Sequence, residues 1–153
     1  MPTSEGEIAI YWDLDHPPLI DAAAPGRAAD AVASCLALAR ALGPVGVQRA
    51  VGGIDAQTGR LAHFLARRGV ECLLAMPGGL PTRPLAGLIE CVVQDLALRP
   101  GIRRVVVMSA RPGLGPLQAL VAGTGRQLLV LRGSGARPNA LRRVAVRQLA
   151  TAA

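Results

Sequence analysis

The chain has 153 residues, which is enough for one ordinary domain to bury a core without disulfides or bound metals. Its net charge is +7 and all 17 basic residues are arginine, which indicates either a coding bias toward arginine or a surface that attracts phosphate groups. Only three aromatic residues are present, which excludes extended base-stacking platforms.

The cysteines and the apolar stretches of the chain indicate the cellular compartment in which it folds. Three cysteines without a Cys-x-x-Cys pair form neither a disulfide framework nor a zinc site, which favours a reducing setting. The N-terminus lacks the layout of a signal peptide. The longest apolar stretch, 31–42, is broken by Arg40 and is too short to cross a bilayer. We therefore expect a cytoplasmic protein without a membrane partner.

Strand-like and helix-like patterns alternate along the chain, which predicts βαβ units around a parallel sheet. Apolar runs bounded by glycine or proline predict strands at 8–12, 45–51, 70–75, 105–108 and 128–131. Apolar residues at helical spacing predict helices at 27–42, 57–68, 85–98, 114–121 and 139–149. No repeat or linker interrupts the pattern. The expected fold is a single domain, 1–153, with three α/β/α layers and a five-stranded, mainly parallel sheet.

The first predicted strand ends in two acids, Asp13 and Asp15, which are followed by His16 and two prolines. Right-handed crossovers place the C-terminal ends of parallel strands at one edge, where open α/β folds bind ligands. Two neighbouring carboxylates at such an edge suit Mg²⁺, which takes one or two acids together with water and substrate phosphates. The alternative is that both acids only cap the turn, and that His16 is a loop residue rather than a ligand.

Arginines follow the last predicted strand and mark the last predicted helix. Arg143 and Arg147 are four residues apart on one helix face, and Arg132 and Arg137 follow the strand at 128–131. Together they would line one side of the strand-end edge and contact a nucleic-acid backbone. The alternative is an ordinary solvated face, because the whole chain is rich in arginine.

The segment Tyr11-Trp12-Asp13-Leu14-Asp15-His16-Pro17 resembles the opening motif of NYN-type domains. These form a PIN-like nuclease group whose first strand ends in aromatic-Asp-x-(Glu/Asp)-Asn. The order of elements is similar over nearly the whole chain, and 105–109 resembles the fourth strand of that group. The resemblance implies a PIN-like fold and cleavage of RNA that depends on Mg²⁺ or Mn²⁺. It also implies that Asp13 and Asp15 are metal ligands and catalytic residues, and that RNA is the partner.

The chain departs from the NYN pattern after its fourth strand. Where that group has Ser-Gly-Asp-x-Asp-Phe, this chain has Ser109-Ala110-Arg111-Pro112-Gly113-Leu114, so both aspartates are missing and one position is cationic. Val92 stands where the resemblance implies a helix acid, which leaves Glu90 and Asp95 as substitute metal ligands.

Arg111 changes the chemistry expected at this edge. A divalent cation needs several anionic ligands, and two carboxylates beside an arginine make a poor cage. We hypothesise that Arg111 takes the place of the metal and pairs with Asp13 or Asp15. Under this hypothesis the domain keeps the fold and loses most of the catalysis.

Three functions stay open at this point. The first is a weakened ribonuclease that uses Asp13 and Asp15 with Mg²⁺ or Mn²⁺. The second is a non-catalytic module that binds RNA or a protein partner through Arg111 and the other arginines. The third is a haloacid-dehalogenase-like phosphatase, with Asp13 and Asp15 as nucleophile and acid and Ser109 as the phosphate-binding hydroxyl. That scheme needs late carboxylates, and no acid follows Asp95.

Overall fold

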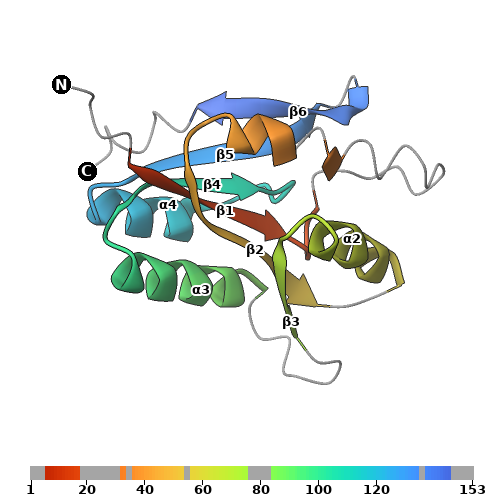
Figure 1. Cartoon of the computed structure of the whole chain (residues 1–153), viewed down its shortest axis with the longest axis horizontal. Coiled ribbons are helices and arrows are strands. Elements are labelled where there is room, and N and C mark those ends of the chain that lie inside the picture. The colour runs from red at the N-terminus through yellow and green to blue at the C-terminus, as the bar shows by residue number, and fades with distance from the viewer. Residues whose placement is uncertain are drawn as a thin grey trace.

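Six strands form one sheet in the order β3-β2-β1-β4-β5-β6 (Figure 1). The computed structural model describes residues 6–17, 32–33, 36–53, 56–75, 84–134 and 137–145. Within these ranges the side chains of 56–58, 74–75, 84, 132–134 and 137–145 are not described. The strands are β1 (Glu7–Asp13), β2 (Val45–Gly53), β3 (Glu71–Ala75), β4 (Ile102–Met108), β5 (Gln127–Ser134) and β6 (Arg137–Ala145).

Strand β1 lies at the centre of the sheet and is buried on both faces, as its continuous apolar sequence predicts. Because side chains alternate along a strand, Ile10 and Trp12 face one layer, whereas Ala9 and Tyr11 face the other. All four are fully or almost fully buried, as is their neighbour Ile8. The central strand is therefore anchored on both sides, which fixes the position of its acidic end.

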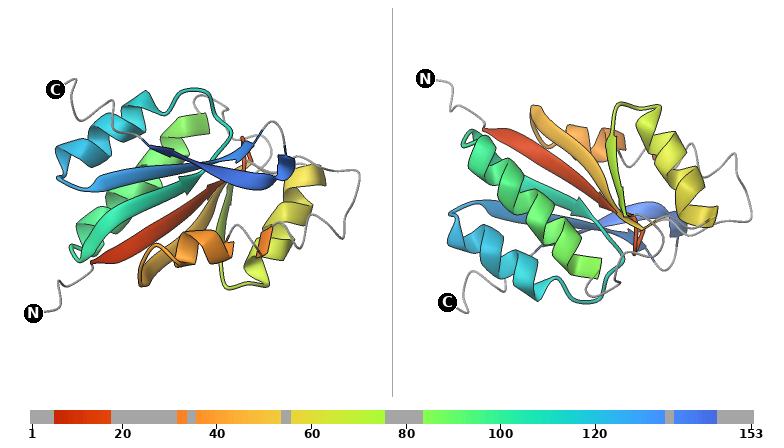
Figure 2. Two further views of the ribbon diagram at one scale, coloured as in Figure 1. Left: turned by 90° about the horizontal axis from the view of Figure 1, so that it is seen from above. Right: turned by 90° about the horizontal axis from the view of Figure 1, so that it is seen from below.

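The helices cover both faces of the sheet. Helix α2 (Ala56–Ala66) and a helical segment at 36–40 pack on one face, with Leu36 and Leu65 in the core. Helices α3 (Pro84–Leu98) and α4 (Gly115–Gly123) lie side by side on the other (Figure 2). The first five strands in chain order are parallel. The predicted α/β/α fold with five parallel strands is confirmed.

One predicted element is wrong. The stretch 139–149 was expected to be a helix, but the chain forms the antiparallel strand β6 over Arg137–Ala145, paired with β5. Without β6, the outer edge of β5 would present a row of unpaired backbone N–H and C=O groups. Pairing those groups outweighs the helical spacing of the apolar side chains. Pro138 lies near the start of this last strand, where a missing N–H is tolerated.

The other predicted elements agree with the structure to within a few residues, where they are described. For the helix expected at 27–42, the described residues 32–33 and 36–40 are helical, and the rest lie outside the described residues. Among the helices that the structure describes, none has the length and apolar character needed to span a membrane. That the whole of 1–153 is a single domain stays a prediction.

Gly52, near the end of β2, lets the chain pack closely beside the end of β1. A Cβ atom at this position would lie 2.8 Å from Leu14 Cβ and 2.9 Å from the backbone nitrogen of Asp15. The next residue, Gly53, donates its N–H to Asp15 Oδ1 at 2.9 Å. The glycine pair therefore holds the turn that follows Asp13.

Candidate functional site

The candidate site lies at the C-terminal ends of β1 and β4, which are neighbours in the sheet. The chain builds outward from β1 to β2 and β3, and then crosses to the other side of β1 to form β4. Open α/β sheets bind ligands at this reversal of strand order. Asp13 ends β1, and Ser109 and Arg111 follow β4, so these three side chains occupy the place where a ligand is expected.

The Asp13 carboxylate accepts five hydrogen bonds. Ser109 Oγ donates to Oδ2 at 2.8 Å, and the backbone N–H groups of Asp15 and His16 donate to Oδ1 at 3.1 and 3.3 Å. Arg111 donates from Nε to Oδ2 at 3.0 Å and from Nη2 to Oδ1 at 3.2 Å. Because an ionised carboxylate offers about four lone-pair positions, none is left for a metal ion.

Arg111 and Asp13 form a buried ion pair. Their side chains are 10% and 1% exposed, and Ser109 between them is fully buried. Arg111 was expected to pair with Asp13 or Asp15, and the structure shows the pair with Asp13. Bidentate geometry makes it one of the stronger kinds of charge-assisted hydrogen bonding.

Backbone contacts hold both sides of the pair in place. Ser109 Oγ accepts the backbone N–H of Arg111 at 3.0 Å, which folds the segment after β4 back toward β1. The N–H of Ala110 donates to the carbonyl oxygen of His16 at 2.8 Å, so the turns after β1 and β4 are joined directly. Asp13 accepting from the two following N–H groups is a common turn device. The alternative that this acid caps its turn therefore describes part of its role.

Asp15 and His16 point elsewhere. Both side chains are exposed, and Asp15 accepts the N–H of Gly53 rather than approaching Arg111 as a second anion. His16 contributes backbone atoms to the site, through the N–H and C=O bonds described above. The predicted pair of carboxylates thus separates into a buried Asp13 and an exposed Asp15.

The two substitute acids do not complete a metal site. Glu90 is exposed on α3, and Asp95 is buried in a separate cluster with Arg49 and Tyr11. No group of three His, Cys, Asp or Glu side chains that could hold a metal ion occurs among the described residues. The predicted set of Asp13, Asp15, Glu90 and Asp95 is not brought together.

The Asp95 cluster was not predicted. Arg49 donates to Asp95 from Nε at 2.9 Å and from Nη2 at 3.0 Å, and Tyr11 donates its hydroxyl at 2.9 Å. Arg49 also pairs with Glu71 of β3 at 2.8 Å. The available signal was an arginine in the middle of an apolar strand, since a cation there needs a buried anion.

The pKa values of Tyr11 and Cys91, the two neutral groups beside Asp95, are raised, which keeps both side chains protonated. Burial raises the pKa of Tyr11, and the adjacent Asp95 carboxylate raises it further. Burial also raises the pKa of the Cys91 thiol to about 11, with Asp95 again adding to the shift. Cys91 Sγ lies 3.7 Å from Asp95 Oδ2. Both groups are neutral at pH 7, so Cys91 has the character of an inert buried thiol.

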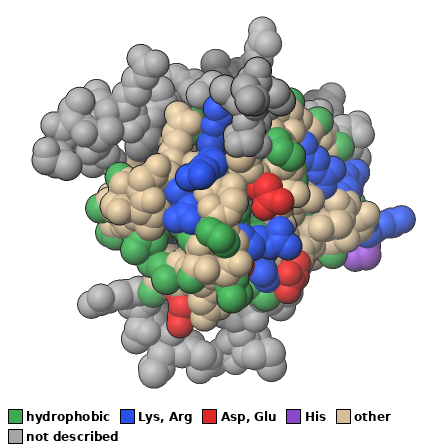
Figure 3. All heavy atoms as spheres, turned by 60° about the vertical axis from the view of Figure 1, so that its left-hand side comes forward, with side chains coloured by type: hydrophobic (Ala, Val, Ile, Leu, Met, Phe, Trp, Pro, Cys, Tyr) green, Lys and Arg blue, Asp and Glu red, His purple; other side chains and the backbone are tan. Residues whose placement is uncertain are grey.

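Most described arginines at the opposite, N-terminal edge of the strands bind backbone carbonyl groups. Figure 3 brings this side of the molecule forward and shows arginines gathered across it. Helices that pack on a parallel sheet end here, and their last carbonyls carry partial negative charge. Such bonds join Arg68 to Phe64 O, Arg104 to Leu42 O and Arg126 to Leu96 O.

The described structure does not bring together the arginines that were predicted to bind nucleic acid. Arg111 is occupied by Asp13. Arg132 lies in β5 and Arg137 and Arg143 in β6, but their side chains are not described. Arg147 lies outside the described residues. The face that Arg143 and Arg147 were expected to share on a helix does not exist, because Arg143 is in a strand.

Together the fold and the site define an α/β protein whose strand-order reversal is filled by its own ion pair. No model of a known protein family matches the chain, and no curated protein matches it. One solved structure that resembles it is glycinamide ribonucleotide transformylase 1 from Symbiobacterium toebii, at 17% identity and a TM-score of 0.42. The match covers 82% of this chain and 50% of that one. We infer nothing about activity from a likeness of this size.

The predicted membership of the NYN nuclease group is wrong. No model of that group, or of any other family, matches the chain. The physical reason lies in the site, because Arg111 neutralises Asp13 and uses the oxygens that a catalytic metal would need. The opening motif is shared with nucleases in sequence, whereas the contacts that would give it nuclease chemistry are absent from the described residues.

The two alternative functions are corrected as well. A phosphatase nucleophile needs a free carboxylate oxygen, and Asp13 has none. An arginine-rich binding surface finds no support, because Arg111 is internal and most of the described arginines at the N-terminal edge bind carbonyls. RNA or protein as partners, and Mg²⁺ or Mn²⁺ as cofactors, stay untested predictions.

Proposed function

We propose that this chain is a non-enzymatic α/β domain in which the ligand-binding edge of the fold is closed by its own side chains. The observation that supports the proposal is the Asp13 carboxylate, which is 1% exposed and has both oxygens fully used within the chain. In this role Asp13 and Arg111 join the ends of β1 and β4 and stabilise the domain.

Functional and structural carboxylates differ in their effect on stability. A carboxylate whose role is to bind a metal or substrate has few partners in the free protein. Replacing it therefore leaves the stability of the protein unchanged or raises it. A carboxylate that neutralises a buried arginine has the opposite effect, because its removal leaves an uncompensated charge. The contacts of Asp13 are of the second kind.

Asp13→Asn tests the proposal, since asparagine keeps the shape of the side chain and removes its charge. Arg111 would then be buried without a counter-charge, and we expect the free energy of unfolding to fall by about 3–5 kcal/mol. Urea denaturation followed by circular dichroism measures this change. The matched control is Asp15→Asn in the same turn, which is exposed and should change the free energy by less than about 0.5 kcal/mol.

A gain in stability for Asp13→Asn would contradict the proposal. The proposal would be fully contradicted if excess Mn²⁺ raised the melting temperature of the wild-type protein but not that of Asp13→Asn. That pair of results would show a metal bound through Asp13.

As part of the proposal we place the domain in the cytoplasm. Cys72 and Cys91 are both unpaired thiols in the structure, and Cys91 is buried. Free buried cysteines are usual in proteins that fold in a reducing compartment.

A further inference from the structure

The outer surface of α3 and α4 carries almost no charge, although the chain as a whole is rich in arginine. The 15 residues of α3 include two acids and no base, and the nine residues of α4 include no charged residue. Asp95 is buried toward the sheet, so Glu90 is the one exposed charge on these two helices. We call this surface the α3–α4 face; it includes Glu90, Val93, Ala97 and Leu98 of α3 and Leu120 of α4.

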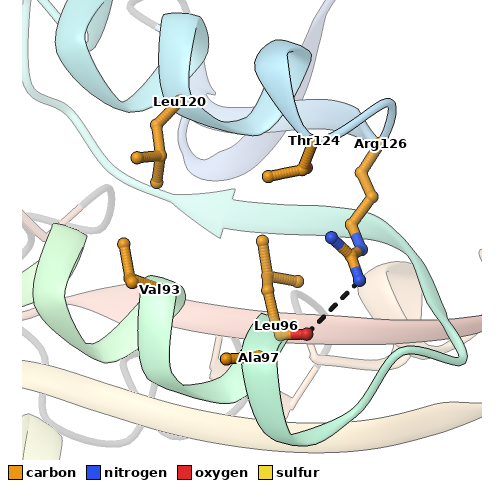
Figure 4. Close-up of a pocket in the computed structure, with 6 residues that line it drawn as sticks. All are labelled: Val93, Leu96, Ala97, Leu120, Thr124 and Arg126. Carbon is orange, nitrogen blue, oxygen red and sulfur yellow. Dashed lines mark hydrogen bonds between the residues drawn. The ribbon is translucent and has the colours of Figure 1, made fainter.

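An apolar groove runs between the two helices. It has a volume of about 220 Å³, and Val93, Leu96 and Leu120 point into it from both sides (Figure 4). Val93 is 43% exposed and Leu98 is 79% exposed, and they are two of four large apolar residues with this degree of exposure in the described part of the chain. Apolar groups that gather in this way on a surface usually mark an interaction site.

The structure assigns this face to a second copy of the same chain. In a two-fold symmetric dimer the same patch meets itself, so the charges of the chain decide which patch is suitable. With a net charge of +7, two copies repel each other wherever arginines meet. Apart from Arg126 at one end of the groove, the α3–α4 face allows two copies to meet without placing arginine against arginine.

Two groups on the face complement each other in charge. Arg126, at one end of the groove, donates to the carbonyl oxygen of Leu96 (Figure 4) and to that of Ile102, and both are neutral acceptors. Neither Arg126 nor Glu90 has an ion-pair partner among the described residues. Their charges are therefore available to another molecule.

Antiparallel packing of α3 on its own copy brings these charges together. With the two-fold axis between Val93 and Gln94, Glu90 of one copy lies level with Ala97 of the other, one residue beyond Leu96. Arg126 of that other copy is hydrogen-bonded at Leu96, so each dimer gains two symmetric pairs of opposite charge. The apolar side chains of the groove lie between them.

The size of the face sets the expected affinity. Helices of 15 and nine residues are about 22 and 14 Å long, so the contact is smaller than the roughly 800 Å² per partner of a standard interface. We therefore expect a dissociation constant on the order of 10 μM. This dimerisation does not depend on the ion pair between Asp13 and Arg111, because it involves other residues on another surface.

Sedimentation equilibrium of the full chain over increasing protein concentration tests the inference. We expect the average mass to rise from that of a monomer toward that of a dimer. Val93→Arg, in the centre of the face, should weaken dimerisation at least tenfold. The matched control is Leu38→Arg, because Leu38 is 45% exposed and lies on the segment 36–40 across the sheet.

A second variant separates loss of dimerisation from loss of folding. Gln94→Arg adds the same charge at another exposed position of α3, beside the two-fold axis, and should also weaken dimerisation at least tenfold; circular dichroism melts establish that both variants fold. Glu90→Gln should weaken the dimer a few-fold and reduce its dependence on salt. The inference is overturned if the wild-type chain stays monomeric at high micromolar concentration. It is also overturned if Val93→Arg dimerises like wild type, or if Leu38→Arg is as damaging as Val93→Arg.

Discussion

Two buried carboxylates, Asp13 and Asp95, are each bound by an arginine through two nitrogen atoms. Arg111 holds the first at the strand edge, and Arg49 holds the second beneath α3. Asp13 also accepts from the Ser109 hydroxyl and two backbone N–H groups, and Asp95 from the Tyr11 hydroxyl and the Cys91 thiol. Burial of a charge is tolerated here because every partner is present, and loss of any one partner should be costly.

The residue contacts were only partly predictable from the sequence. The pairing of Arg111 with Asp13 followed from an arginine in place of an expected acid, since both residues end neighbouring strands. The Asp95 cluster was missed because its members come from three elements far apart in the chain. Such contacts depend on register and helix placement, which a single sequence does not determine.

Tyr11 gives a prediction for alkaline pH. In the unfolded chain its hydroxyl loses a proton near pH 10, whereas burial and Asp95 raise its pKa in the folded protein. Above pH 10 the unfolded state therefore binds fewer protons, and the free energy of unfolding should fall by about 1.4 kcal/mol per pH unit from this group.

Tyr11→Phe isolates that contribution. The chain has one tyrosine and no lysine, so the other side chains that titrate in this range are the cysteines. Cys91 contributes its own loss between pH 9 and about 11. We expect urea denaturation of Tyr11→Phe to show a shallower decrease above pH 10 than wild type. Equal slopes for the two proteins would contradict the buried, protonated state of Tyr11.

At the scale of elements, the turn after β1 is held by a glycine pair on β2 and by the segment after β4. Gly52 allows the close approach, and the bond between Ala110 and His16 joins the two turns. The strands themselves were predictable, because their apolar runs and glycine or proline boundaries are strong signals. Strand β6 was not, because its helical spacing was outweighed by pairing with β5.

Gly52→Ala should destabilise the protein by about 1–3 kcal/mol. The added Cβ would lie too close to Leu14 Cβ and to the backbone of Asp15, and neither atom is the flexible end of a side chain. Chemical denaturation measures the loss. Gly113→Ala is the control, because a Cβ there meets nothing within 4 Å of the described structure. A similar small change in both variants would show that the approach of β2 to the turn is not tight.

At the scale of the whole molecule, the sheet places its reversal of strand order between β1 and β4, and the chain fills that position itself. The arginines then divide by location. Several near helix ends bind carbonyls, Arg49 and Arg111 neutralise buried acids, and the helices α3 and α4 themselves contain none. Several of the arginines that suggested one polyanion-binding surface thus make internal contacts within the described part of the chain.

The most direct test of the closed strand edge is a double-mutant cycle on its ion pair. The free energy of unfolding is measured by urea denaturation for wild type, Asp13→Asn, Arg111→Met and the double variant. Methionine keeps the apolar stem of Arg111 and removes its charge. We predict a coupling energy of at least about 2 kcal/mol, with the double variant more stable than the sum of the single losses implies. Additive losses, with a coupling energy near zero, would show that Asp13 and Arg111 act independently and would contradict the account.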